Sequence, residues 1–594
     1  MNKHIAIMLL FSVNIYGQST GLPVVSIQTH NGVAINSRDI WTDVVSFVLT
    51  DPNNPENNVS RINNAPNDRI RGRGNSTWGA PKKPYRVRFR ENVSFFGLPA
   101  AENWVLLANY YDPTFLGNTF AFELGARLNV PYTPSYHHVE LILNGVHQGS
   151  YLLTEHRQAA PQGVEPGPGR VGIDLTHGWL VEFDFRWHEE VEDAKFRTMH
   201  YNLPIVIKSP DLGNNANNAG YNIVRNDWNR LCNLMMDVDF PENEYREQID
   251  MESIIDYFFV QIVTNNTDFY IGLDGRQEPG SIYFHKDKDA KITAGPLWDF
   301  DLSFRYGVGG PTANSRAYPT YPFFLRFLQD PVFRLRWKEK WNNSYSNIAS
   351  MEHFIDEMAA KIRPSADADY RIWRSNQQIS EFDRRIRMMK EYLLIRLNYM
   401  NSIYNTVDVF PTNVNFGILD YNNVSEIPEQ TFTIVAYGTT ELSARLRGIN
   451  SVFEISTELT PTITEHGGFW ATIGISPKNS NATGVYNDAL IVSGTNQGRS
   501  FSVELPLRIS IRGTTNSPEL NHSQHTNTLQ AWTHNNHLRV TNLIVGETIR
   551  IYNAAGVLIY NAIAAADTSD IALIEQGMYI IQAGDRTVKT IVSF

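Results

Sequence analysis

The pattern of hydrophobic and polar residues changes twice along the chain. From residue 22 to about residue 405 it mixes two kinds of period. Residues 137–153 alternate on both sides of an Asn-Gly pair, which predicts a β-hairpin. Residues 113–130 carry apolar side chains at helical spacing, and residues 251–266 are apolar nearly all round, which predicts a buried helix. Strand patterns dominate the first half and amphipathic helices the second, so we expect an α+β domain of two lobes.

Helical periodicity stops after this region. Residues 407–512 contain short strand patterns between turn signals, at the spacing of a β-sandwich. Residues 513–528 form a polar linker, and residues 529–594 again read as short strands. The predicted fold class is therefore α+β, a two-lobed domain over residues 22–405 followed by two all-β sandwich modules.

The N-terminus has the order of a secretory signal peptide. Lys3 precedes the apolar run Ile5–Val13, and small or polar residues follow near Gly17. We assign residues 1–18 to this signal and expect cleavage near Gly17. The apolar run is too short to span a bilayer as a helix, and no later segment reaches that length, so no membrane span is expected in the mature chain. The single cysteine, Cys232, excludes an intramolecular disulfide.

The charge is acidic overall but basic in one place. The 594 residues carry a net charge of −11, which argues against a general nucleic-acid binder. Residues 69–89, RIRGRGNSTWGAPKKPYRVRF, are the exception. Gly72 and Gly74 permit close backbone approach, Asn75 adds a polar side chain, and Lys83 is expected on one strand face with Tyr85. Nucleotide phosphates, a polyanionic surface partner, or no ligand at all are the three interpretations.

Two acidic features further along bear on that choice. Asp268 follows the predicted buried helix, and Asp299 and Asp301 flank Phe300 in the sequence WDFD. On a strand the two aspartates project from the same face, where they repel unless a cation lies between them. Cation ligands with a separate base are what phosphoryl transfer requires. The same carboxylates as an acid and a base of a polysaccharide hydrolase are a weaker alternative.

Several segments together resemble the CotH kinase family of spore-coat-type proteins. RGRGNSTWGAPKKPYRVRF, GSYLLTEHRQ, GWLVEFD, PIVIKSPD, TNNTDFY and GPLWDFDLSF occur in the family's order, over roughly residues 22–405. The resemblance implies an atypical protein-kinase-like fold. It also implies that Asp268 is the catalytic aspartate and that Asp299 and Asp301 hold the metal.

The resemblance further implies a nucleotide site around the basic segment. Lys83 is our choice for the lysine that meets the phosphates, with Lys82 and Lys208 as competitors. Glu155 is its candidate partner, and Arg73 and Asn75 complete the predicted nucleotide contacts. The sequence departs from the family in one respect. Many members carry an asparagine shortly after the catalytic aspartate, whereas here Asp274 would have to take that place.

The two C-terminal segments have resemblances of their own. Residues 407–512 are similar to Ig-like modules of bacterial surface proteins. Residues 529–594, with IRIYNAAGVLIY and QGMYIIQ, resemble the C-terminal sorting domain of type IX secretion cargo in Bacteroidetes. Together with the signal peptide, this tail implies a secreted or cell-surface protein whose partners include the type IX secretion machinery.

The resulting functional hypothesis is an exported, CotH-like atypical kinase. It would transfer phosphate from ATP to a hydroxyl of a protein substrate, with Mg²⁺ or Mn²⁺. The alternative is a catalytically weak secreted or surface protein that binds a cell-envelope or extracellular partner. WDFD and Asp268 favour the kinase, while the missing asparagine favours the binding protein.

Overall fold

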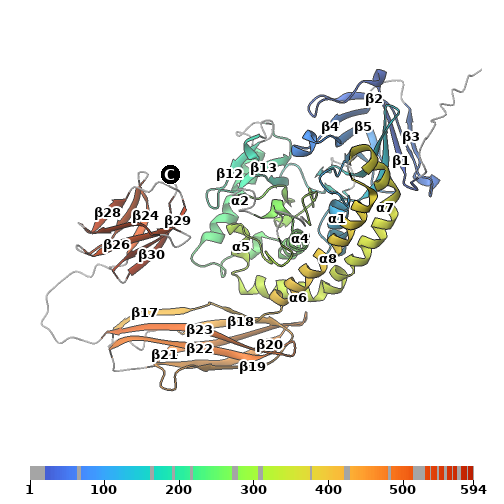
Figure 1. Cartoon of the computed structure of the whole chain (residues 1–594). Helices are drawn as coiled ribbons and strands as arrows, with labels where there is room; N and C mark the ends of the chain where they lie inside the picture. Colours follow the sequence, from blue (N-terminus) through green and yellow to red (C-terminus); the bar gives the residue numbers. More distant parts are fainter. Residues whose placement is uncertain are drawn as a thin grey trace, which may run out of the picture. The chain divides into compact units, whose positions relative to one another are not determined.

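The computed structural model describes most of the chain and divides it into two compact units, residues 1–513 and 514–594 (Figure 1). The described residues are 20–62, 68–160, 166–189, 194–213, 219–270, 278–304, 312–374, 377–420, 429–478, 483–512, 529–534, 537–544, 547–553, 558–564, 566–571, 577–584 and 586–592. Among them, no helix is long and apolar enough to cross a membrane.

The first part of the chain forms an eight-stranded sheet in the order β1-β7-β8-β6-β5-β4-β2-β3. Its strands are β1 (Val24–Thr29), β2 (Thr42–Thr50), β3 (Val59–Ile62), β4 (Asp68–Gly72), β5 (Tyr85–Val93), β6 (Ala101–Leu107), β7 (His137–Leu143) and β8 (Val146–Glu155). The predicted hairpin is confirmed: β7 and β8 pair antiparallel around Asn144 and Gly145, which both have positive φ.

A second, five-stranded sheet follows in the order β12-β13-β11-β14-β15. Its strands are β11 (Trp179–Phe183), β12 (Lys195–Arg197), β13 (Pro204–Ser209), β14 (Ile282–Lys286) and β15 (Thr293–Ala294). Two short strands follow β8 and precede β11 along the chain, and they pair with each other: β9 (Gln158–Ala159) and β10 (Arg170–Val171).

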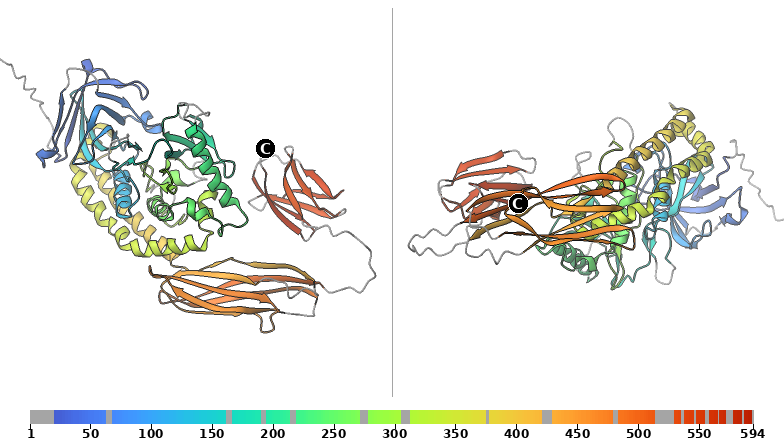
Figure 2. Two further views of the ribbon diagram at one scale, coloured as in Figure 1. Left: turned by 180° about the vertical axis from the view of Figure 1, so that it is seen from behind. Right: turned by 90° about the horizontal axis from the view of Figure 1, so that it is seen from below.

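Helices contribute to the core that connects these sheets. They are α1 (Gly117–Arg127), α2 (Ala219–Met236), α3 (Tyr245–Gln248), α4 (Met251–Val263), α5 (Pro322–Phe327), α6 (Pro331–Ala349), α7 (Met351–Trp373) and α8 (Ile379–Tyr404). The helix predicted over residues 251–266 is confirmed as α4, eleven of whose residues are buried. Helices α7 and α8 lie side by side in Figures 1 and 2, and α7 packs against β8 of the first sheet. Mixed strand and helix content over this region agrees with the predicted α+β class.

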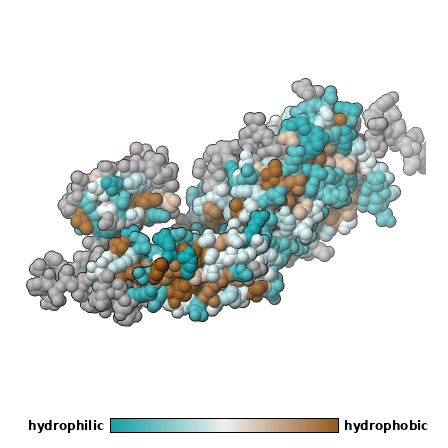
Figure 3. Space-filling view, turned by 60° about the horizontal axis from the view of Figure 1, so that its bottom comes forward, coloured by the Kyte–Doolittle hydropathy of each residue, from teal (hydrophilic) through white to brown (hydrophobic). Residues whose placement is uncertain are grey.

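The next strands form a β-sandwich that belongs to the same compact unit. One sheet has the order β16-β18-β21-β20 and the other β17-β23-β22-β19. The strands are β16 (Asp408–Phe410), β17 (Val414–Asp420), β18 (Gln430–Tyr437), β19 (Thr439–Leu446), β20 (Phe453–Ile463), β21 (Gly468–Pro477), β22 (Gly484–Asn496) and β23 (Arg499–Arg512). Figure 3 shows hydrophobic and hydrophilic residues interspersed on the face in view, without a single continuous apolar surface.

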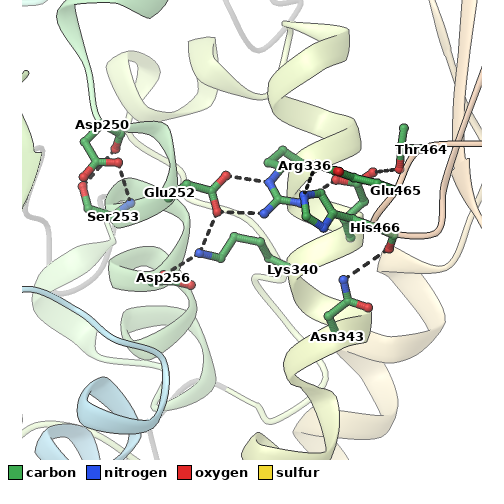
Figure 4. Close-up of polar contacts among 11 residues, drawn as sticks. Asp250, Glu252, Ser253, Asp256, Arg336, Lys340, Asn343, Thr464, Glu465 and His466 are labelled. Carbon is green, nitrogen blue, oxygen red and sulfur yellow. Dashed lines mark hydrogen bonds and ion pairs between the residues drawn. The ribbon is translucent and has the colours of Figure 1, made fainter.

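The sandwich is anchored to helix α6 by charged contacts. Asp408 at its first strand pairs with Arg334 (2.7 Å) and Lys338 (2.8 Å). Near the β20–β21 turn, the hydroxyl of Thr464 donates to Glu339, and Asn343 donates to the His466 carbonyl (3.2 Å) (Figure 4). These contacts make the sandwich continuous with the helical region instead of a tethered module.

The second unit is all-β. It contains a three-stranded sheet, β24-β25-β28, and a four-stranded sheet, β27-β26-β29-β30. The strands are β24 (Gln530–His534), β25 (His537–Thr541), β26 (Thr548–Asn553), β27 (Leu558–Ile563), β28 (Thr568–Ile571), β29 (Gly577–Ala583) and β30 (Arg586–Val592). Its own small core includes Leu538, Ile549 and Ile581.

Candidate functional site

The acidic segment around residue 300 is a loop, so the strand predicted for WDFD is wrong. Asp299 has φ +66, a left-handed conformation that aspartate tolerates but a strand excludes. The loop is fixed by side chains in place of a sheet ladder, because the Asn118 side-chain oxygen accepts a hydrogen bond from the Phe300 amide (2.9 Å). Trp298 and Phe300 are buried, as the aromatic pattern predicted.

The side chains of Asp299 and Asp301 nevertheless line the same cavity. Asp299 and Asp301 line a narrow cavity together with Arg73, Asn118 and Trp298. Its volume, about 20 Å³, accommodates one water molecule or ion but not a nucleotide. Burial, reinforced by the neighbouring carboxylates of Asp299 and then Asp268, raises the pKa of Asp301 well above its usual value. The loop therefore brings two carboxyl groups to one buried cavity.

Asp268 is tied to the same loop through an asparagine. It lies in the 3-10 turn Thr267–Phe269, directly after helix α4, and is buried. The Asn266 side-chain oxygen accepts a hydrogen bond from the Asp268 amide (3.3 Å), and its Nδ2 donates to the Asp299 carbonyl (3.4 Å). Asn266 thus fixes the backbone of both acidic segments at once.

Two arginines, Arg73 and Arg157, lie close enough to Asp299 to interact with its charge. The guanidinium groups of Arg73 and Arg157 lie 5.3 and 4.9 Å from the centre of the Trp298 ring. Burial, followed by the repulsion of Arg157, lowers the pKa of Arg73 to about 10. Within the described residues, the Arg73 guanidinium makes no hydrogen bond or ion pair. Two stacked guanidiniums beside two carboxylates suit a ligand that carries both anionic oxygens and a cation.

Lys83 does not reach this cavity. Strand β5 begins at Tyr85, so Lys83 precedes the strand and the expected common strand face is not formed. Its ammonium group donates to the Trp78 carbonyl (2.7 Å) and lies over the Trp78 ring. Trp78 was not considered in the sequence prediction. It holds the Lys83 side chain against residues 72–79, which we call the glycine loop.

Lys82, the first competitor, does line the cavity but is fully engaged elsewhere. It is 0% exposed and pairs with the equally buried Asp369 of α7 at 2.5 Å. It also donates to the carbonyls of Ala108 (2.9 Å) and Ser150. These partners make Lys82 a bridge between the first sheet and helix α7.

The predicted pairing of Glu155 with a lysine is also wrong. One carboxylate oxygen of Glu155 accepts hydrogen bonds from the amide (2.9 Å) and hydroxyl (2.7 Å) of Ser135. Asn75 is exposed, and its side-chain oxygen accepts from Arg38 (2.7 Å), away from the acidic loop.

Lys208, the second competitor for the role of phosphate-binding lysine, shares an acidic partner with Arg157. It lies 3.4 Å from Glu182 on the neighbouring strand β11, and Arg157 lies 3.7 Å from the same carboxylate. Four further residues of this region were not predicted from the sequence: Glu182, Arg157, Asn118 and Asn266. The signal for Glu182 was present, since one acidic residue interrupts the apolar strand WLVEF.

The described carboxylates do not form a complete metal cage by themselves. No group of three or more His, Cys, Asp or Glu side chains in the described part of the chain is close enough to hold a metal ion. Asp299 and Asp301 do fit the smaller protein contribution typical of Mg²⁺, which takes one or two carboxylates plus water and phosphate oxygens. Asp274, the candidate for the missing asparagine, lies outside the described residues.

Comparison with known families identifies the region that contains this site. The family model described as CotH kinase protein matches residues 70–400, more than half of the chain. The chain belongs to the CotH kinase family. The match covers the glycine loop, Arg157, Glu182, Asp268 and the acidic loop, so all the residues brought together above lie in the CotH domain.

Other comparisons add little. No curated protein matches this chain significantly. Among solved structures, the Pseudomonas aeruginosa CupB2 chaperone matches with 13% identity over 31% of this chain and 100% of that chain, at a TM-score of 0.15. The E. coli chaperone DraB matches with 9% identity over 32% of this chain and 98% of that chain, at a TM-score of 0.14. TM-scores this low do not establish a shared fold.

Proposed function

We propose that this member of the CotH kinase family transfers the terminal phosphate of ATP to a hydroxyl group of a protein. The observation that carries the proposal is that Asp299, Asp301 and Arg73 line one cavity, and that the guanidiniums of Arg73 and Arg157 both lie against Trp298. Phosphoryl transfer depends mainly on positioning and on charge neutralisation, and this arrangement offers both. We further propose that the two sheets of the CotH domain are the two lobes of an atypical kinase.

Each residue has a distinct role in this proposal. Asp299 and Asp301 hold Mg²⁺ or Mn²⁺, which when bound neutralises the phosphate oxygens. Arg73 and Arg157 bind the oxygens of the transferred group, and the Lys208–Glu182 pair takes the role first assigned to Lys83. The site must open for a nucleotide to enter, because the present cavity is only about 20 Å³.

The proposed transfer moves one proton and replaces one oxygen–phosphorus bond by another. Asp268 orients the acceptor hydroxyl and accepts its proton as the new oxygen–phosphorus bond forms. The bond between the terminal phosphorus and the bridging oxygen breaks, and ADP leaves with that oxygen. The Asn266 side chain holds the backbones of Asp268 and Asp299 in fixed positions during the transfer.

Substitutions of the two acidic segments test the proposal. Asp299→Ala should abolish Mg²⁺-dependent binding of a fluorescent ATP analogue. Asp268→Ala should retain that binding and lose phosphate transfer by about 100-fold or more. Asp356→Asn, which removes a surface pair with Lys390, is the control and should behave as wild type. Wild-type protein that binds no nucleotide at millimolar Mg²⁺ would refute the kinase proposal.

The second candidate is a catalytically weak exported protein that binds an envelope or extracellular partner. The narrow cavity is the observation that favours it. For either function we propose export through the N-terminal signal and the C-terminal sorting module, with residues 407–512 as an Ig-like module. Cell fractionation that finds the mature protein in the cytosol with both ends intact would overturn the export proposal.

A further inference from the structure

Helix α8 carries a fully buried arginine next to the end of helix α4, the helix that precedes Asp268. Arg396 is 0% exposed, and α8 packs against α4. A guanidinium stays charged at every physiological pH, so its burial is unfavourable unless its N–H groups are all used. The partners of Arg396 therefore show what this buried charge stabilises.

Each of the five guanidinium N–H groups of Arg396 has an oxygen acceptor. Nε donates to the Ile262 carbonyl in the last turn of α4 (2.5 Å), and Nη2 donates to the Tyr270 hydroxyl (3.4 Å). The other three hydrogen bonds reach carbonyl oxygens of one short segment, those of Ala313 (3.1 Å), Ser315 (2.6 Å) and Arg316 (3.0 Å). All five acceptors are neutral, so Arg396 serves to hold backbone and a hydroxyl in place.

The two segments that Arg396 joins flank the proposed chemistry in the sequence. The turn that contains Asp268 lies between Ile262 and Tyr270, and residues 313–316 follow the acidic loop along the chain. The Tyr270 hydroxyl itself donates to the Arg316 carbonyl (2.9 Å), which closes the connection between the two segments. Arg396 is therefore a bridge between the Asp268 turn and the chain that follows Asp299 and Asp301.

Helix α8 makes a second contact with the same turn. The Tyr392 hydroxyl, one helical turn before Arg396, accepts a hydrogen bond from the Asn265 side chain (2.5 Å). Asn265 precedes Asp268 and Tyr270 follows it, so α8 holds the turn on both sides of the aspartate in the sequence.

We infer that Arg396 is a positioning residue for the proposed transfer, which fixes the turn that carries Asp268 against residues 313–316. This inference rests on the proposed kinase function. A general base acts only within hydrogen-bond reach of the proton that it accepts, and a misplacement of about 1 Å lowers a rate by about 100-fold. Because Arg396 acts through Asp268, its loss should lower kcat and leave nucleotide binding intact.

Arg396→Lys tests this role. Lysine keeps the positive charge but has three N–H donors on one nitrogen in place of a planar fork, so it cannot hold both segments. We expect kcat for phosphate transfer to fall about 10-fold or more, with the KM for ATP within about twofold of wild type. In an Asp268→Ala background the same substitution should lower the residual rate by less than about twofold, since the base that it positions is gone.

Hydrogen exchange measures the positioning without turnover. In Arg396→Lys, amides of residues 262–270 and 312–317 should exchange faster, while those of the β7–β8 hairpin keep their wild-type rates. Tyr270→Phe is a milder variant, used as well in case Arg396→Lys does not fold. It removes only the hydroxyl that joins the turn to Arg396 and should lower kcat about fivefold, the loss of one hydrogen bond.

Arg326→Lys is the matched control. Its Nε also donates to a backbone carbonyl, that of Met235 at the end of α2 (2.8 Å), but none of its contacts reaches residues 262–270. This variant should keep kcat within about twofold of wild type and leave the exchange of residues 262–270 unchanged.

Three results would overturn the inference. It fails if Arg396→Lys, or Tyr270→Phe in its place, transfers phosphate as fast as wild type. It fails if exchange rises equally throughout the domain, which would indicate a general loss of stability, or if the effect on the rate is undiminished in the Asp268→Ala background. Wild-type protein without transfer activity would refute the kinase proposal and this role with it, whereas active wild type with an equally active Arg396→Lys refutes only the role of Arg396.

Discussion

Replacement of Lys82 by methionine separates a structural lysine from a phosphate-binding one. Lys82 and Asp369 are 0% and 1% exposed and 2.5 Å apart. Burial lowers the pKa of Lys82 and raises the pKa of Asp369, so for both groups desolvation outweighs their attraction. Lys82→Met keeps most of the side-chain volume but leaves the Asp369 carboxylate buried without its cation.

The magnitude follows from that geometry. Removal of one partner from a buried ion pair costs about 3–5 kcal/mol of stability. The carbonyls of Ala108 and Ser150 also lose their donor. The double variant Lys82→Met/Asp369→Asn should recover at least half of the loss, because the asparagine oxygen still accepts from the Ser150 amide and no buried charge remains.

The assay is urea unfolding of the full chain, followed by tryptophan fluorescence, with ATP-analogue binding measured on the same samples. Lys83→Met is the control, and it should unfold within about 0.5 kcal/mol of wild type, since Lys83 is a partly exposed residue with one carbonyl partner. Lys82→Met with wild-type stability but no analogue binding would refute the structural role and make Lys82 the phosphate lysine.

Two further predictions concern the glycine loop and helix α4. A Cβ on Gly72 would lie 2.2 Å from the Trp78 ring, so Gly72→Ala should displace the loop and weaken ATP-analogue binding at least about 10-fold, whereas Gly79→Ala, with nothing within 4 Å, should not; equal binding by the two variants would contradict this. Burial, with smaller contributions from Glu252 and Asp250, raises the pKa of Asp256 to about 7 despite its pair with Lys340. Because the folded state binds this proton more tightly than the unfolded chain, the contribution of Asp256 to stability is complete below about pH 4 and falls as the pH rises to about 7. Asp256→Asn should flatten the pH dependence of the unfolding free energy in that window, and an unchanged slope would count against the raised pKa.

The sequence by itself determined several elements and the acidic residues of the proposed site. Alternation around Asn144 and Gly145 specified the β7–β8 hairpin, and continuous apolarity specified the buried helix α4, because both signals are local. The family's segments also led to Asp268, Asp299 and Asp301, since their order along the chain is visible without any fold.

Only the tertiary structure decided which charges meet. Lys83 and Lys82 are neighbours in sequence, yet one lies on Trp78 and the other is buried against Asp369, which follows it by almost the length of the CotH domain. Glu155 binds Ser135 in place of a lysine, while Arg157 lies over Trp298 and 3.7 Å from Glu182. A side chain's partner depends on which distant segments pack against it and on what that packing leaves buried, and neither can be read from spacing along the chain.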